Sequence, residues 1–237
     1  MNKVILEDVR KIDFHYEEAI KTLQTNTRFA GRDIKSIMIT SCYPNEGKSD
    51  IAFSLAREMA ASGKRVLLID ADIRKSSYIS RFRVKEKVAG LSQYLSGQTS
   101  VQELIYQTNY TNLDMIFAGP PAPNPPALLS SDAFSALIEK IREHYHYIFV
   151  DTPPIGSIID AAVVAQKCDG AIMIVESEAV SRRMLQKCLN QIRKSGCEIL
   201  GGVLNKVDTK RNKYYSSYYK KYDAYYRQSN TKQESQE

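Results

Sequence analysis

The segment Thr40-Ser-Cys-Tyr-Pro-Asn-Glu-Gly-Lys-Ser49 follows an apolar run and precedes an amphipathic one, which is the setting of a phosphate-binding P-loop. In such a loop, backbone N–H groups and the start of the next helix surround the phosphates. Lys48 would contact the β- and γ-phosphates, and the Ser49 hydroxyl would bind Mg²⁺. Cys42 stands where the pattern has its first glycine. We therefore expect a nucleotide site formed by Asn45, Glu46, Gly47, Lys48, Ser49 and Asp50.

Short apolar runs recur on both sides of this loop and are separated by amphipathic stretches. The runs predict buried strands at 36–40, 65–70, 113–117, 147–151, 171–176 and 198–205. The amphipathic stretches predict helices at about 49–62, 132–143 and 179–195. This alternation predicts a doubly wound α/β fold of the P-loop NTPase type, with a mainly parallel sheet and helices on both faces.

Changes in composition divide the chain into three parts. We expect an N-terminal helical segment at 1–35 with its helix at 16–28, a P-loop domain at 36–207, and a flexible tyrosine-rich tail at 208–237. Within the domain, the proline-rich segment 119–126 is predicted to be an extended connection to a helix that begins near Ser131. The length of 237 residues and 43% hydrophobic content suit one such domain plus a tail.

Composition also narrows the class of protein. No stretch approaches the roughly 18 consecutive apolar residues of a membrane-spanning helix, and the first residues are too charged for a signal peptide, so we expect a cytosolic protein. The four cysteines lie far apart, which argues against a zinc site or a disulfide framework. Of the net charge of +6, seven basic and two acidic residues between Lys206 and Arg227 supply +5. The folded domain is therefore nearly neutral, and we expect no nucleic-acid partner.

Three carboxylates follow predicted strands. Asp70 and Asp72 end the run that begins at residue 65, and Asp151 ends the run 147–151. Because the ends of parallel strands meet at one sheet edge, these carboxylates should lie beside Lys48 and Ser49. Clustered carboxylates repel one another unless a cation binds between them, so the sequence predicts a Mg²⁺ site there.

Four motifs together carry a resemblance to a known family. They are Ser41-x-x-Pro-x-Glu-Gly-Lys-Ser49, Leu67-Leu-Ile-Asp-Ala-Asp-Ile-Arg74, Ala118-Gly-Pro-Pro-Ala-Pro-Asn-Pro125 and Asp151-Thr-Pro-Pro154. With a tyrosine-rich tail behind them, they resemble the bacterial tyrosine kinases of capsule and exopolysaccharide synthesis, the CpsD/CapB kind. The resemblance runs from about Tyr16 to Tyr226.

The resemblance implies a catalytic site and its cofactors. It implies ATP as the phosphate donor, with Asn205 near the adenine and Lys48 on the phosphates. It implies that Asp70 accepts the tyrosine proton, while Asp72 and Asp151 join Ser49 around Mg²⁺. The division of these roles between Asp70 and Asp72 stays open. Asp50 departs from the family, which commonly has threonine at this position.

The resemblance also implies partners. It implies a membrane-anchored activator of the polysaccharide co-polymerase type, which would hold the kinase at the inner face of the membrane, a cognate tyrosine phosphatase, and protein substrates. The family motif E-x-x-R-x-x-R, tied to ring-shaped oligomers, appears as Glu18-x-x-Lys21-x-x-Gln24. A homo-oligomer, with a ring as one form, is therefore expected through Glu18, Lys21 and Gln24.

The tail concentrates seven of the fifteen tyrosines of the chain in thirteen residues: Tyr214, Tyr215, Tyr218, Tyr219, Tyr222, Tyr225 and Tyr226. An aromatic helix stripe would need aliphatic neighbours, which this segment lacks. Stacking on single-stranded nucleic acid is the alternative that stays open. We interpret the tyrosines as phosphoacceptors of autophosphorylation, because each phosphate adds roughly −1.5 to −2 charges and would reverse the positive charge of the tail.

Three other classes remain as alternatives. Partitioning ATPases of the MinD/ParA kind share the motif at 67–74 but carry an extra lysine where Tyr43 stands. A regulatory GTPase is suggested by Asn205-Lys-Val-Asp208, which matches the guanine-reading pattern N-K-x-D. The third is a nucleotide-dependent scaffold without catalysis, whose tail binds a partner.

Overall fold

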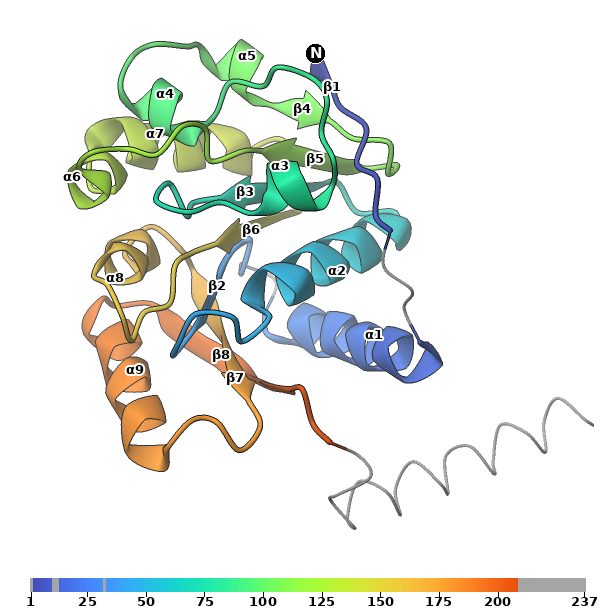
Figure 1. The fold of residues 1–237 in the computed structure, drawn as a ribbon, viewed down its shortest axis with the longest axis vertical. Helices are drawn as coiled ribbons and strands as arrows, with labels where there is room; N and C mark the ends of the chain where they lie inside the picture. Colours follow the sequence, from blue (N-terminus) through green and yellow to red (C-terminus); the bar gives the residue numbers. More distant parts are fainter. Residues whose placement is uncertain (1, 10–12, 32, 209–237) are drawn as a thin grey trace, which may run out of the picture.

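The computed structural model describes residues 2–9, 13–31 and 33–208. These residues form an eight-stranded sheet in the order β1-β4-β5-β3-β6-β2-β7-β8, with helices on both faces (Figure 1). All neighbouring strands are parallel except the pair β4 and β5. The predicted doubly wound, mainly parallel α/β fold is confirmed.

The six predicted strands are present, and two short strands were not predicted. The strands are β1 Asn2–Lys3, β2 Ser36–Ser41, β3 Val66–Asp70, β4 Tyr106–Gln107, β5 Leu113–Ile116, β6 Tyr147–Asp151, β7 Gly170–Glu176 and β8 Glu198–Asn205. Two residues cannot produce a periodic pattern, so β1 and β4 leave no signal in the sequence.

The four predicted helices are also present, within a few residues of their expected ends. The helices are α1 Phe14–Phe29, α2 Lys48–Ala61, α3 Tyr78–Arg81, α4 Leu91–Leu95, α5 Val101–Leu104, α6 Pro125–Leu129, α7 Asp132–Arg142, α8 Asp160–Ala165 and α9 Arg182–Lys194. The remaining five have only four to six residues each, too short for a helical period to be recognised.

One prediction about the proline-rich segment was wrong. The segment 119–126 was expected to be extended throughout, yet α6 begins at Pro125 and includes Pro126. The first N–H groups of a helix have no partner within the helix, so prolines at its first positions lose no hydrogen bond. The following helix, α7, begins just after Ser131, as expected.

The apolar core lies on both faces of the sheet. In β2, Ile37 and Ile39 belong to one buried cluster with Phe53 of α2, while Met38 belongs to the other. The second cluster includes the inner side of α7, represented by Phe134. Figure 1 shows α1 and α2 on one side of the sheet and α7, α8 and α9 on the other. This double burial fixes the strands, and with them the residues at their carboxyl ends.

The predicted N-terminal helix, α1, packs on α2. Its first turn is capped by Asp13, whose carboxylate accepts a hydrogen bond from the Tyr16 N–H at 2.8 Å. The Tyr16 hydroxyl donates to Ser54 Oγ of α2 at 3.0 Å. None of the helices within the described ranges is both long and apolar enough to cross a membrane.

Candidate active site

The loop between β2 and α2 has the backbone of an anion-binding turn. Asn45 and Gly47 both have left-handed backbones, with φ of 66° and 88°. A Cβ atom on Gly47 would lie 2.3 Å from Nδ2 of Asn205, so this position requires glycine. The loop leads directly into the N-terminus of the fourteen-residue helix α2, where free N–H groups attract phosphate. The predicted P-loop thus has the local structure that its function needs.

The Glu46 carboxylate holds the loop in place. The side chain is 2% exposed, and its two oxygens accept hydrogen bonds from the backbone N–H groups of Tyr43, at 2.7 Å, and Glu176, at 3.1 Å. Sequence analysis expected Glu46 to bind the nucleotide. In the structure this side chain ties the loop to the end of β7, and it contributes to the site by positioning the loop.

The end of β8 supports the loop from the other side. Asn205 donates through Nδ2 to the Glu46 carbonyl at 2.8 Å, and Lys206 donates through Nζ to the Asn45 carbonyl at 2.6 Å. Lys206 also forms an ion pair with Glu176 at 2.9 Å. The sequence 205–208 therefore makes contacts with the P-loop backbone that do not require a guanine base.

Lys48 and Ser49 open α2 and are both partly exposed, as a phosphate site requires. Lys48 Nζ donates to Ser49 Oγ at 3.2 Å. Asp50 follows, and its carboxylate forms an ion pair with Arg81 at 2.5 Å, from Oδ1 to an Nη nitrogen. The negative charge of Asp50 is thus matched by a cation, which explains how a P-loop helix accommodates it.

Asp70 and Asp151 meet across the sheet. They end β3 and β6 in the same register and are each 1% exposed. Burial, and then the neighbouring Asp151 carboxyl, raise the pKa of Asp70 to about 8. Burial also raises the pKa of Asp151, while the Lys48 ammonium opposes that rise. Two buried carboxyls side by side cannot both ionise without a cation, which is the electrostatic state predicted for this edge.

Asp72 lies beside this pair, just beyond β3, and is partly exposed. Its negative charge raises the pKa of both Asp70 and Asp151. Its backbone N–H donates to Asp70 Oδ1 at 3.2 Å, and its carboxylate accepts from the Lys75 N–H at 3.0 Å. The structure therefore brings all three predicted carboxylates together.

One oxygen of the cluster suits a metal ion. Asp151 Oδ1 is buried and has no hydrogen-bond partner among the described residues. No group of three His, Cys, Asp or Glu side chains in that part of the chain could hold a metal by itself. Mg²⁺ at nucleotide sites is usually held by one or two carboxylates together with phosphate oxygens. The donor set at Asp151 fits that mode of binding.

Three contacts at the site were not foreseen. The Ser76 hydroxyl donates a short hydrogen bond to Asp70 Oδ2, and the Tyr78 hydroxyl donates to the Ser49 carbonyl at 3.0 Å. Arg74 forms a two-bond ion pair, at 2.7 and 3.0 Å, with Asp160, whose side chain is fully buried at the start of α8. Arg74 was part of the quoted motif, but nothing near Asp160 in the sequence marks it as the partner.

The remaining predicted residues lie away from this cluster or outside the described chain. On α1, Glu18 and Lys21 form an ion pair at 2.7 Å, and Gln24 is 8% exposed. The structure therefore pairs the first two residues of the predicted oligomer motif within one chain. The seven tail tyrosines lie outside the described residues.

Comparison with known proteins points to one family. A sequence model of the AAA domain matches residues 35–198. Tyrosine-protein kinase CpsD of Streptococcus pneumoniae serotype 4 is 39% identical over 209 residues, which cover 88% of this chain and 90% of that protein. The kinase domain of Escherichia coli tyrosine kinase ETK superposes with a TM-score of 0.77 at 31% identity, covering 81% of this chain and 76% of that chain.

A more distant likeness concerns the fold alone. The septum site-determining protein MinD of Pyrococcus horikoshii, solved with Mg-ADP, superposes with a TM-score of 0.59 at 22% identity. The match covers 76% of this chain and 72% of that chain.

Proposed function

Because the chain belongs to the family of bacterial tyrosine-protein kinases that includes CpsD, we propose that it transfers the γ-phosphoryl group of ATP to tyrosine hydroxyls. One observation carries the proposal. The P-loop residues Lys48 and Ser49 lie at the same sheet edge as the buried, paired carboxyls of Asp70 and Asp151. A phosphate site beside a proton acceptor is what phosphoryl transfer to a hydroxyl requires.

Each side chain has a separate role. Lys48 stabilises negative charge on the transferring phosphoryl group. Ser49, Asp72 and Asp151 hold Mg²⁺, which when bound neutralises charge on the phosphate oxygens. Asp70 accepts the tyrosine proton. Its pKa of about 8 lies close to neutral pH, which suits a group that must gain and release a proton. The more exposed Asp72 is the second candidate for the base.

The proposed acceptors are the tyrosines of the chain's own tail, between 214 and 226. They lie in a segment whose charge is +5 from Lys206 to Arg227, and phosphorylation would make it acidic. The family further suggests a role in capsular or exopolysaccharide synthesis and export. It also suggests a membrane-anchored activator that brings this cytoplasmic chain to the membrane, a cognate phosphatase and other protein substrates. Assembly through α1 into a homo-oligomer belongs to the same proposal, and a ring is one form.

ATP is the proposed nucleotide. The GTPase alternative rested on Asn205-Lys-Val-Asp208, but Asn205 and Lys206 already donate to P-loop carbonyls. The MinD-like alternative has a likeness in fold but lacks the extra lysine, since Tyr43 occupies that position. These two observations favour the kinase over both.

The test is incubation of the full chain with labelled ATP, Mg²⁺ and a fused activator segment, followed by mass spectrometry of the tail. We expect phosphate on tyrosines between 214 and 226, and none in Lys48→Met. Lys140→Met is the matched control, because Lys140 is an exposed lysine on α7. Labelling that survives Lys48→Met would overturn the proposed site.

A further inference from the structure

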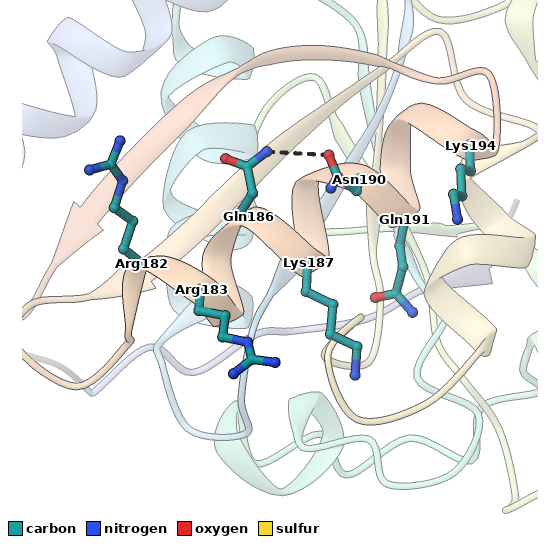
Figure 2. A pocket seen from close by; sticks show the side chains of 7 residues that line it. All are labelled: Arg182, Arg183, Gln186, Lys187, Asn190, Gln191 and Lys194. Atoms are coloured by element: carbon teal, nitrogen blue, oxygen red, sulfur yellow. Dashed lines mark hydrogen bonds between the residues drawn. The ribbon is translucent and has the colours of Figure 1, made fainter.

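Helix α9 presents a face made of cations and amides. Arg182, Arg183, Lys187 and Lys194, together with the amides of Gln186 and Asn190, line an open depression of about 850 Å³. The sequence of α9 contains no Asp or Glu. None of the ion pairs formed among the described residues involves these four cations. We call this surface the α9 cationic face (Figure 2).

The placement of these charges opposes the stability of the helix. Arg182 and Arg183 occupy the first turn, where the helix dipole disfavours positive charge by about 0.3–1 kcal/mol each. Arg183 and Lys187, four residues apart, repel each other on one side of the helix, as Figure 2 shows. Such an arrangement is favourable only when an anion binds, because a helix N-terminus and arginines both donate to phosphate oxygens.

The surface therefore calls for an anionic partner, and the chain carries one within reach. The backbone carbonyl of Asn205, at the end of β8, accepts a hydrogen bond from the Ser177 N–H at 2.9 Å. Ser177 precedes Arg182 by five residues, so at most about 17 Å of chain separates this point from α9. Tyr214 follows Asn205 by nine residues, which span up to about 30 Å when extended. The tail thus leaves the domain near the α9 cationic face.

The spacing of the two segments also matches. Arg183, Lys187, Gln191 and Lys194 stand at offsets of 0, 4, 8 and 11 residues along α9. Tyr214, Tyr218, Tyr222 and Tyr225 have the same offsets in the tail. Phosphates carried at these intervals would meet donors at the same intervals.

We propose that the phosphorylated tail segment 214–226 docks on the α9 cationic face of its own chain. Without phosphate the tail is positive and is repelled by the face. Four phosphates, at roughly −1.5 to −2 charges each, make the tail negative and attract it. Docking moves the modified tail from the carboxylate-lined active site to a surface that holds phosphate. The proposal rests on tail phosphorylation by the proposed kinase, and its test is independent of that activity.

The test uses a synthetic fluorescent peptide of residues 210–228, either unmodified or phosphorylated at the four tyrosines with matching offsets. Binding to the full, phosphatase-treated chain is measured without ATP by fluorescence anisotropy at low salt. We expect the phosphopeptide to bind at least about tenfold more tightly than the unmodified peptide. We also expect Arg183→Gln with Lys187→Gln to weaken phosphopeptide binding about tenfold, since two charge-assisted contacts are lost.

The control is Lys87→Gln with Lys140→Gln, which removes the same charge from exposed positions elsewhere. Equal binding of the two peptides would overturn the proposal, as would equal losses in the α9 and control variants. A chain that ignores the phosphopeptide but sediments with phosphatidylglycerol vesicles through Arg183 and Lys187 would overturn it in favour of a lipid surface. Absence of tail labelling by ATP, with phosphopeptide binding intact, would contradict the kinase proposal alone.

Discussion

Replacing Asp70 by asparagine should stabilise the nucleotide-free protein. Asp70 is 1% exposed, and its pKa rises from the ordinary value of 3.8 to about 8. Between these two values the unfolded chain releases a proton that the folded chain keeps, so the folded state loses stability as pH rises. Each pKa unit corresponds to about 1.36 kcal/mol. The carboxyl therefore costs at most about 4 kcal/mol at pH 7 and about 6 kcal/mol above pH 8.

Asparagine carries no charge and can still accept the hydrogen bond from Ser76. We expect Asp70→Asn and the parental chain to be equally stable below about pH 4, where both side chains are neutral. At higher pH the variant should become the more stable of the two, and the difference should shrink when Mg²⁺ and nucleotide are added to the parental chain.

Urea denaturation at several pH values measures this difference. The matched control is Asp132→Asn, because Asp132 is an exposed aspartate at the start of α7 whose replacement should change stability by no more than about 0.5 kcal/mol. An Asp70→Asn variant that is less stable than the parental chain at pH 8, or a difference that does not vary with pH, would refute the reasoning.

Three further outcomes follow from the same geometry. Gly47→Ala should reduce nucleotide binding and destabilise the fold by about 1–3 kcal/mol, because the new Cβ would clash with the Asn205 amide at a left-handed backbone; normal binding by titration calorimetry would count against it. Asp151→Asn should lose Mg²⁺-dependent ATP binding while Asp70→Asn retains it, and equal affinities for Mg·ATP in both variants would mean that the metal has been misplaced. ATP should compete more strongly than GTP for the site, since Asn205 contacts the P-loop backbone; the opposite preference in competition binding would favour the GTPase alternative.

The sequence was sufficient for the parts of the fold that rest on regular patterns. The P-loop glycine and lysine, and the apolar strands on both sides, predicted β2, α2 and the other five long strands. The strands β1 and β4 have two residues each and depend on pairing with distant chain, which no local pattern records. The start of α6 at Pro125 was missed because proline was taken as a helix breaker, although the first turn of a helix tolerates it.

The same distinction holds at the candidate site. Asp70, Asp72 and Asp151 could be placed together because the ends of parallel strands share an edge. The structural role of Glu46 could not be foreseen, since its partner Glu176 lies 130 residues away. The buried partner of Arg74 was missed for the same reason: an ion pair between distant residues is a property of packing and leaves no local signal.

The most direct test of the kinase account mixes two variants with labelled ATP, Mg²⁺ and the activator segment. One is a full-length Lys48→Met chain, which keeps its tail but lacks the phosphate clamp. The other is an active chain truncated after Val207, which has the site but no tail tyrosines. The account predicts phosphate on tyrosines 214–226 of the Lys48→Met chain, delivered by the truncated partner. A Lys48→Met tail without phosphotyrosine in this mixture would contradict it.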